Sequence, residues 1–168
     1  LENASIKKAL AYVATNFAKT PDRAPPTIEE GLQAAMNSAM AEFASIRSVI
    51  DKGDFQIVYQ PIVRLLPRKV HHYEALLRLS DGRNLYETIN FSEQIGLIHD
   101  FDIAVCKKVF EAAETHKNVI LAVNVSGQSI ANPQFGTVFR KMIQPLRHLN
   151  QQVMFEITET GEIIDFET

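Results

Sequence analysis

The segment HHYEALLRLS, residues 71–80, carries an acidic and a basic side chain four residues apart. In an α-helix, Glu74 and Arg78 would form an ordinary i,i+4 surface pair. In a β-strand, both would lie on one face of a sheet, where an acid and a base can build a site. The preceding segment FQIVYQPIV has the composition of a strand, and LLPRK between the two is typical of a turn. We therefore favour two strands closed by a short turn.

Two later segments also place polar side chains late in predicted strands. VILAVNVS is a nearly continuous apolar run that contains Asn124, and QVMFEITE contains Glu156 and Glu159. Such runs are typical of strands covered on both faces. Asn124 alone is compatible with a turn or cap residue in a polar loop, NVSGQSIANP. Glu156 is harder to explain structurally, because a carboxylate between two large apolar residues of a buried strand needs a partner or a metal ion.

The elements that position these side chains alternate between strands and helices. Apolar spacing predicts a helix in DFDIAVCKKVFEAAETH, with Cys106 as a small buried residue, and a short helix in FSEQIG. A further helix opens at Asn132-Pro133 and extends through Leu146. Strands that alternate with helices predict an α/β fold with a parallel sheet. Polar residues late in the strands are where a β/α barrel assembles its active site.

Residues 1–54 are predicted to be helical. KTPDRAPPT breaks a first helix, ASIKKALAYVATNF, because its three prolines cannot continue it. Thr27 and Glu30 have the spacing of a capping box, and the helix that they open stops at Gly53. Its apolar stripe is typical of a packing or dimer surface and comprises Leu32, Met36, Met40, Phe43, Ile46 and Ile50.

Composition excludes several classes of protein. The net charge of −3 and the pI near 6.0 argue against broad binding to DNA or RNA polymers or to anionic membranes. A single cysteine excludes an internal disulfide and fits a reducing compartment. The sequence shows neither a membrane span nor a signal peptide, so we expect a cytoplasmic protein or the cytoplasmic part of a membrane-anchored one. The ends of the chain suggest a longer protein, whose sensor or membrane domains would lie outside this chain.

Four motifs occur in a fixed order: YQP at 59–61, EALLR at 74–78, NVS at 124–126 and EITE at 156–159. This ordered set resembles the EAL-type cyclic-di-GMP phosphodiesterase family, from about Ala44 to the end of the chain. The resemblance implies a modified TIM (β/α) barrel with an antiparallel first strand, only partly present here. It divides the chain into a helical N-terminal segment, residues 1–43, and a truncated EAL domain, residues 44–168.

The resemblance also implies the metal and catalytic residues. Glu74, Asn124 and Glu156 match the metal-ligand positions of the family. Two carboxylates and an amide oxygen suit Mg²⁺ or Mn²⁺ better than zinc. Glu74 is also expected to be catalytic, together with Glu159, which matches a glutamate that steadies a loop over the site.

The substrate implied by the resemblance is cyclic-di-GMP, which the family hydrolyses to the linear dinucleotide pGpG. Gln60, Leu76 and Arg78 match substrate-binding positions, and a guanidinium suits a phosphate because it can bond two oxygens at once. We also expect a homodimer.

Two departures from the family pattern support a rival function. The segment SDGRNLYETINFSEQIGLI is shorter than is usual in the family and lacks its Pro-x-x-Phe. The family's paired aspartates, later lysine and final glutamate are not in this chain, so we expect the chain as it stands to lack activity. The alternative is a catalytically inactive receptor that binds cyclic-di-GMP and passes the signal to a partner.

Two adjacent histidines, His71 and His72, invite a metal-site hypothesis. Neighbouring side chains on a regular strand point to opposite faces. We therefore expect the two rings to lie apart and to play no shared role.

Overall fold

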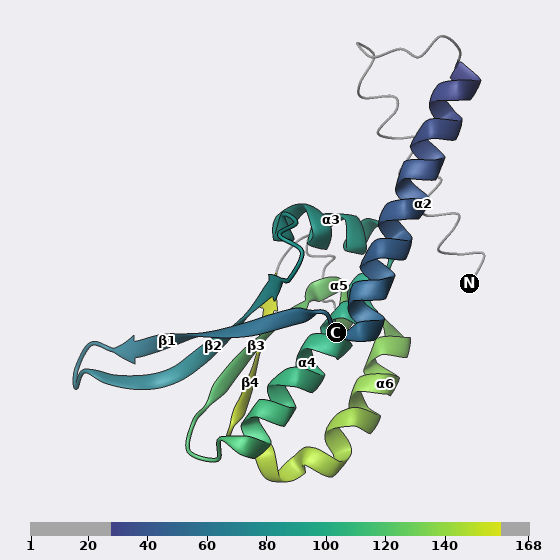
Figure 1. Cartoon of the computed structure of the whole chain (residues 1–168). Coiled ribbons are helices and arrows are strands. Elements are labelled where there is room, and N and C mark those ends of the chain that lie inside the picture. Colours follow the sequence, from purple (N-terminus) through teal and green to yellow (C-terminus); the bar gives the residue numbers. More distant parts are fainter. Residues whose placement is uncertain (1–27, 159–168) are drawn as a thin grey trace, which may run out of the picture. The chain divides into compact units, whose positions relative to one another are not determined.

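The computed structural model describes residues 28–158 (Figure 1). The expected first helix, the capping residue Thr27 and the catalytic candidate Glu159 lie outside the described residues. The described residues form two compact units, one from residues 28–54 and 83–97 and the other from residues 55–82 and 98–158. No helix in either unit is long and apolar enough to cross a membrane.

The first unit contains helix α2, Ile28–Lys52. It ends at Gly53, whose φ of +63° is the left-handed conformation that glycine adopts without a steric penalty. Ile46 and Ile50 of the expected apolar stripe are buried. Met40 is instead 59% exposed, whereas its neighbour Ala39 is buried, so the helix departs from the expected stripe at Met40.

Helix α3, Leu85–Ile95, also belongs to the first unit and begins earlier than expected. The sequence predicted a short helix only after Asn90, which is wrong. The side chain of Asn84 accepts hydrogen bonds from the backbone N–H groups of Tyr86 and Glu87, at 3.0 and 3.3 Å. An asparagine at this position satisfies N–H groups that the first helical turn leaves without partners, and this stabilises the additional turn.

The second unit is built on a four-stranded sheet in the order β1-β2-β3-β4. The strands are Phe55–Arg64, Lys69–Leu79, Leu121–Ser126 and Val153–Thr158. β1 is antiparallel to β2, whereas β2, β3 and β4 are parallel. The strand interpretation of HHYEALLRLS and the antiparallel first strand are therefore confirmed, as is the mixed α/β fold class.

The helices of this unit are α4, Ile98–Thr115, α5, Gly127–Ile130, and α6, Pro133–Ile143. NVSGQSIANP is thus not only a loop, because it includes α5. The expected helix through Leu146 is interrupted, since a 3-10 helix, Gln144–Leu149, follows α6. Pro145 lacks the N–H that an α-helical hydrogen bond would need, which accounts for the break.

Helices α4 and α6 cover one face of the sheet. Phe155 on β4 packs edge-on against Phe110 of α4 and Phe139 of α6, with ring centroids 6.2 and 5.3 Å away. The side chains of Val123 and Val125 are fully buried in β3. This apolar layer leaves the opposite face of the same strands to carry the polar residues.

The start of β1 is attached to α4 by Lys108. Its Nζ donates a hydrogen bond of 2.6 Å to the carbonyl oxygen of Phe55 and lies 4.3 Å from the centroid of the Phe55 ring. The ammonium group therefore makes both a hydrogen bond and a cation–π contact. Phe55 also packs against Phe101, with ring centroids 5.8 Å apart.

Cys106 lies in the core of α4 with no exposed surface. Burial raises the pKa of its thiol from 9.0 to about 12, and the nearby Asp102 carboxylate adds to the shift. At pH 8 the folded protein should therefore hold about a thousandfold less thiolate than an ordinary cysteine. We expect iodoacetamide to label Cys106 in native protein at a small fraction of its rate in urea-unfolded protein.

The same pKa shift predicts how Cys106 contributes to stability. The contribution of Cys106 to the free energy of unfolding is complete below pH 9 and is lost as the pH rises towards 12, because the thiol of the unfolded protein ionises first.

In the iodoacetamide experiment, equal labelling rates in native and unfolded protein would show that Cys106 is not buried in solution.

Candidate functional site

The predicted site residues share the face of the sheet opposite α4 and α6. Gln60 on β1 is the register partner of Glu74 on β2, and Asn124 on β3 is the partner of Glu156 on β4. Glu74 is paired with Ala122, two residues before Asn124 and so on the same face. Strand pairing therefore places both carboxylates and both amides on one surface.

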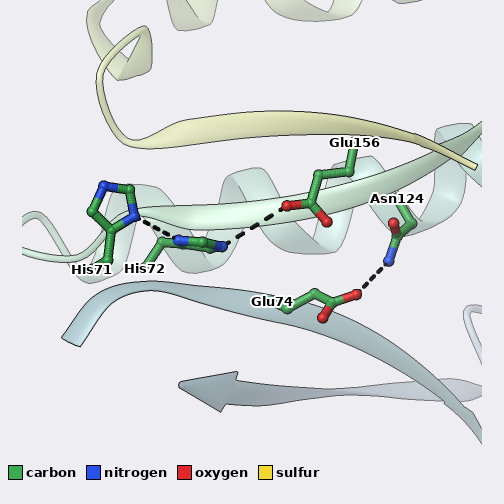
Figure 2. A network of polar contacts seen from close by, with 5 residues as sticks. All are labelled: His71, His72, Glu74, Asn124 and Glu156. Atoms are coloured by element: carbon green, nitrogen blue, oxygen red, sulfur yellow. Dashed lines mark hydrogen bonds and ion pairs between the residues drawn. The ribbon is translucent and has the colours of Figure 1, made fainter. Parts of the chain in front are cut away.

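Glu74 and Asn124 are in direct contact (Figure 2). Asn124 Nδ2 donates a hydrogen bond of 2.9 Å to Glu74 Oε1. The two residues are fifty positions apart in the sequence and are joined through the parallel pairing of β2 and β3. Both side chains are half-buried.

Glu156 lies beside this pair and contacts a different residue. Its Oε1 is 3.8 Å from Nε2 of His72, and its side chain is 41% exposed. Asn124 is its immediate neighbour across the strand pair. The expectation that Glu156 lies in a buried strand is wrong, because its neighbours Phe155 and Ile157 are 43% and 61% exposed. Water can reach this carboxylate, so burial does not oblige it to have the histidine as a partner.

The expectation that His71 and His72 would lie apart is wrong. Their Nδ1 atoms are 2.8 Å apart, and the ring planes are nearly perpendicular, at 83°. The reason is an irregularity in the strand pairing: Ile62 pairs with His72 and Val63 with Val70, which leaves His71 without a register partner. Such a bulge interrupts the alternation of side chains, so two consecutive rings can meet.

The expected substrate-binding residues lie along β1 and β2. Gln60 is exposed and Leu76 is half-buried. Arg78 is exposed, and its Nη1 donates a hydrogen bond of 2.9 Å to the carbonyl oxygen of Leu77 rather than to Glu74. Glu74 and Arg78 share a face, as expected, but do not form an ion pair.

Asp102 on α4 is a buried acidic residue that the sequence analysis did not single out. Its Oδ2 accepts a hydrogen bond of 3.0 Å from the backbone N–H of Ser126, the last residue of β3. The Ser126 side chain in turn accepts a hydrogen bond of 3.2 Å from the N–H of Gln128 at the start of α5. Asp102 therefore holds the end of the strand that carries Asn124. The sequence did contain one signal that could have identified Asp102, because an acidic residue inside the apolar stripe of a helix needs a polar partner.

Replacing Asp102 by Ala should destabilise the fold by about 1–3 kcal/mol, because the buried N–H of Ser126 would lose its acceptor. Urea unfolding followed by circular dichroism would measure the loss. Glu111→Ala, at an exposed position on the same helix, is the matched control and should change stability little. Equal stability of the two variants would contradict this role.

The oxygen donors on this face fit a divalent cation of the Mg²⁺ class. Carboxylate and amide side chains of three neighbouring strands share one face, although Asn124 contacts Glu74 through its amide nitrogen. Within residues 28–158, however, no three His, Cys, Asp or Glu side chains converge as a metal centre. The candidate set has only two acidic members, and its third is an amide.

Comparison with known proteins identifies the family. The sequence model of the EAL domain matches residues 43–168. The chain belongs to the EAL domain family. This agrees with the antiparallel β1, the parallel β2–β4 and the placement of the EAL tripeptide, Glu74–Leu76, within β2.

Relatives of this EAL domain include two bacterial proteins. The uncharacterized protein Rv1357c of Mycobacterium tuberculosis is 32% identical over 101 residues, which cover 54% of this chain and 33% of Rv1357c. The probable cyclic di-GMP phosphodiesterase PdeI of Escherichia coli is 28% identical over 144 residues, which cover 79% of this chain and 17% of PdeI. The EAL domain described here thus spans a third or less of either relative.

A solved structure supports the fold. Vibrio cholerae LapD, an S helix-GGDEF-EAL protein bound to c-di-GMP, superposes with a TM-score of 0.63 at 22% identity. The match covers 70% of this chain and 30% of LapD. At this identity the likeness establishes the barrel-like fold of the EAL domain alone.

Proposed function

We propose that this domain belongs to a cyclic-di-GMP phosphodiesterase that hydrolyses its substrate to linear pGpG with divalent metal ions. The observation that carries the proposal is the placement of Glu74, Asn124 and Glu156 on one face of three adjacent parallel strands. A structural role alone would not require two acidic side chains on the same face of β2 and β4, on either side of Asn124 in β3.

Glu74, Asn124 and Glu156 would hold the metal ion. Their donor chemistry favours Mg²⁺ or Mn²⁺, and EAL domains in general depend on divalent metals. When bound, such an ion polarises a phosphoryl oxygen and lowers the pKa of a water molecule. In this structure the Glu74 carboxylate is instead satisfied by the N–H of Asn124, so the amide must turn its oxygen towards a cation. Glu159 would steady the loop over the site.

Arg78, Gln60 and Leu76 would bind the substrate. Arg78 shares the face of Glu74 and uses one guanidinium nitrogen on the neighbouring Leu77 carbonyl. Its remaining donors suit a phosphate group. Gln60 stands directly opposite Glu74 in the strand register and can hydrogen-bond a ribose or phosphate at the same level of the sheet.

One relative and one structural neighbour support this substrate. PdeI is named a probable cyclic di-GMP phosphodiesterase, and the LapD structure holds c-di-GMP. The proposal includes a cytoplasmic location and a homodimer, as the sequence led us to expect.

The alternative is a receptor that binds cyclic-di-GMP without cleaving it. The shortened segment after Arg78 favours this function, because it departs from the family pattern close to the substrate-binding residues. The two functions differ in product formation rather than in ligand binding.

The deciding experiment incubates the full-length protein with cyclic-di-GMP and Mg²⁺ or Mn²⁺ and separates the nucleotides by chromatography. The enzyme produces pGpG, and added EDTA stops the reaction. Tight ligand binding without any pGpG at millimolar metal would instead establish the receptor. Failure to bind the dinucleotide would contradict both functions.

A further inference from the structure

Three side chains form a continuous polar chain that ends on Glu156 (Figure 2). His71 contacts His72 through their Nδ1 atoms at 2.8 Å, and His72 Nε2 faces Glu156 Oε1 at 3.8 Å. The His72 side chain is only 11% exposed, whereas that of Glu156 is 41% exposed. The imidazole is therefore the more buried member of the contact and the carboxylate the more exposed one.

The chemistry of neutral imidazole determines which of these side chains donates a hydrogen bond and which accepts it. One ring nitrogen carries a hydrogen and the other accepts, so one Nδ1 atom of the pair must donate to the other. If His71 donates, His72 carries its hydrogen on Nε2 and presents an N–H to the Glu156 carboxylate. The reverse order would turn a nitrogen lone pair towards a negative charge. The carboxylate thus favours donation from His71 to His72 and from His72 towards Glu156.

We propose that His72 is a positioning residue for Glu156 and that His71 fixes the orientation of the His72 ring. This inference rests on the proposed function, in which Glu156 holds a divalent ion. Groups that orient a metal ligand typically contribute a tenfold to hundredfold increase in metal affinity. At 3.8 Å the interaction is electrostatic rather than a direct hydrogen bond, so we expect the lower end of that range.

The test is a Mn²⁺ titration of the full-length protein, in which free Mn²⁺ is followed by electron paramagnetic resonance. His72→Phe keeps a planar ring in the same space but has no nitrogen, and it should weaken Mn²⁺ binding about tenfold. His72→Gln can place an amide N–H where Nε2 stands, and it should restore most of the affinity. His71→Phe should weaken binding less than His72→Phe, because it acts only through the ring of His72.

Glu156→Gln separates failure of this inference from failure of the proposed metal site. If Glu156→Gln binds Mn²⁺ as tightly as the wild type, Glu156 is not a ligand and the proposed site is wrong. If Glu156→Gln weakens binding but His72→Phe does not, the metal site stands and the positioning role is wrong. A pulsed electron paramagnetic resonance spectrum that shows ¹⁴N coupling between a bound imidazole and Mn²⁺ would also overturn that role, because His72 would then be a ligand.

A thermal unfolding scan of each variant verifies that it is folded. Should His72→Phe fail to fold, His72→Gln and His72→Asn form a second comparison. The shorter Asn side chain reaches the place of Nδ1 but not that of Nε2. Positioning predicts that Asn binds Mn²⁺ more weakly than Gln, and equal affinities would contradict it.

Discussion

Replacing Glu74 by Gln should reduce Mg²⁺-dependent hydrolysis of cyclic-di-GMP by the full-length protein at least about a hundredfold. The substitution keeps the size of the side chain and its ability to accept the 2.9 Å hydrogen bond from Asn124, but it removes the negative charge. The strand pairing should therefore survive, while the affinity for a divalent cation falls. Initial rates of pGpG formation, measured over a range of Mg²⁺ concentrations, would show the loss.

The matched control for Glu74→Gln is Glu111→Gln, the same chemical change at an exposed position of α4. This variant should retain the wild-type rate. A Glu74→Gln protein with full activity would mean that Glu74 is not part of the catalytic site. Rescue of the variant at high Mg²⁺ would instead support a role in binding the metal.

Replacing Arg78 by Ala should weaken the binding of cyclic-di-GMP about tenfold to a hundredfold, since hydrogen bonds to charged groups contribute roughly 1.5–3 kcal/mol. Arg78→Lys keeps the charge but not the paired donors, and it should fall between the wild type and Ala. Isothermal titration calorimetry with Ca²⁺ in place of Mg²⁺ would measure the affinity for cyclic-di-GMP without turnover.

Arg68→Ala, in the turn between β1 and β2, is the control for Arg78. It removes the same charge from an exposed position away from the site face. If both arginine variants lose the same affinity, the effect of Arg78 is a general electrostatic one. If neither changes affinity, Arg78 does not bind the dinucleotide.

The arrangement of the sheet could be predicted because the sequence contains strong local signals for it. The β-branched composition of β1 and the apolar run of β3 identified strands whatever the details of packing. HHYEALLRLS was ambiguous by itself, and its strand character followed from its neighbours. The end of α2 at Gly53 was also predictable, since the glycine adopts the left-handed conformation there.

The candidate site was predictable as a set of residues but not as a set of contacts. Parallel strands bring polar residues near their ends to one edge, which placed Asn124 beside Glu156. The amide of Asn124 could have formed a hydrogen bond with several neighbours. Its hydrogen bond to Glu74 depends on the register of β2 against β3. The alternation of side chains within one strand does not determine its register against the next strand.

Two features could not be predicted from the sequence because they depend on residues of other elements. The contact between His71 and His72 requires a bulge opposite Ile62, which the alternation rule for a regular strand excludes. The role of Asp102 depends on a backbone N–H that lies twenty-four residues away. In both cases a local rule was overruled by a partner on another element.

The central claim is that Glu74, Asn124 and Glu156 hold one divalent ion between them. The most direct measurement is an anomalous difference map from crystals of the full-length protein soaked in Mn²⁺. We expect a peak bonded to carboxylate oxygens of Glu74 and Glu156 and to the amide oxygen of Asn124. A map with no peak at these residues, or a Mn²⁺ ion bound only elsewhere, would contradict the claim.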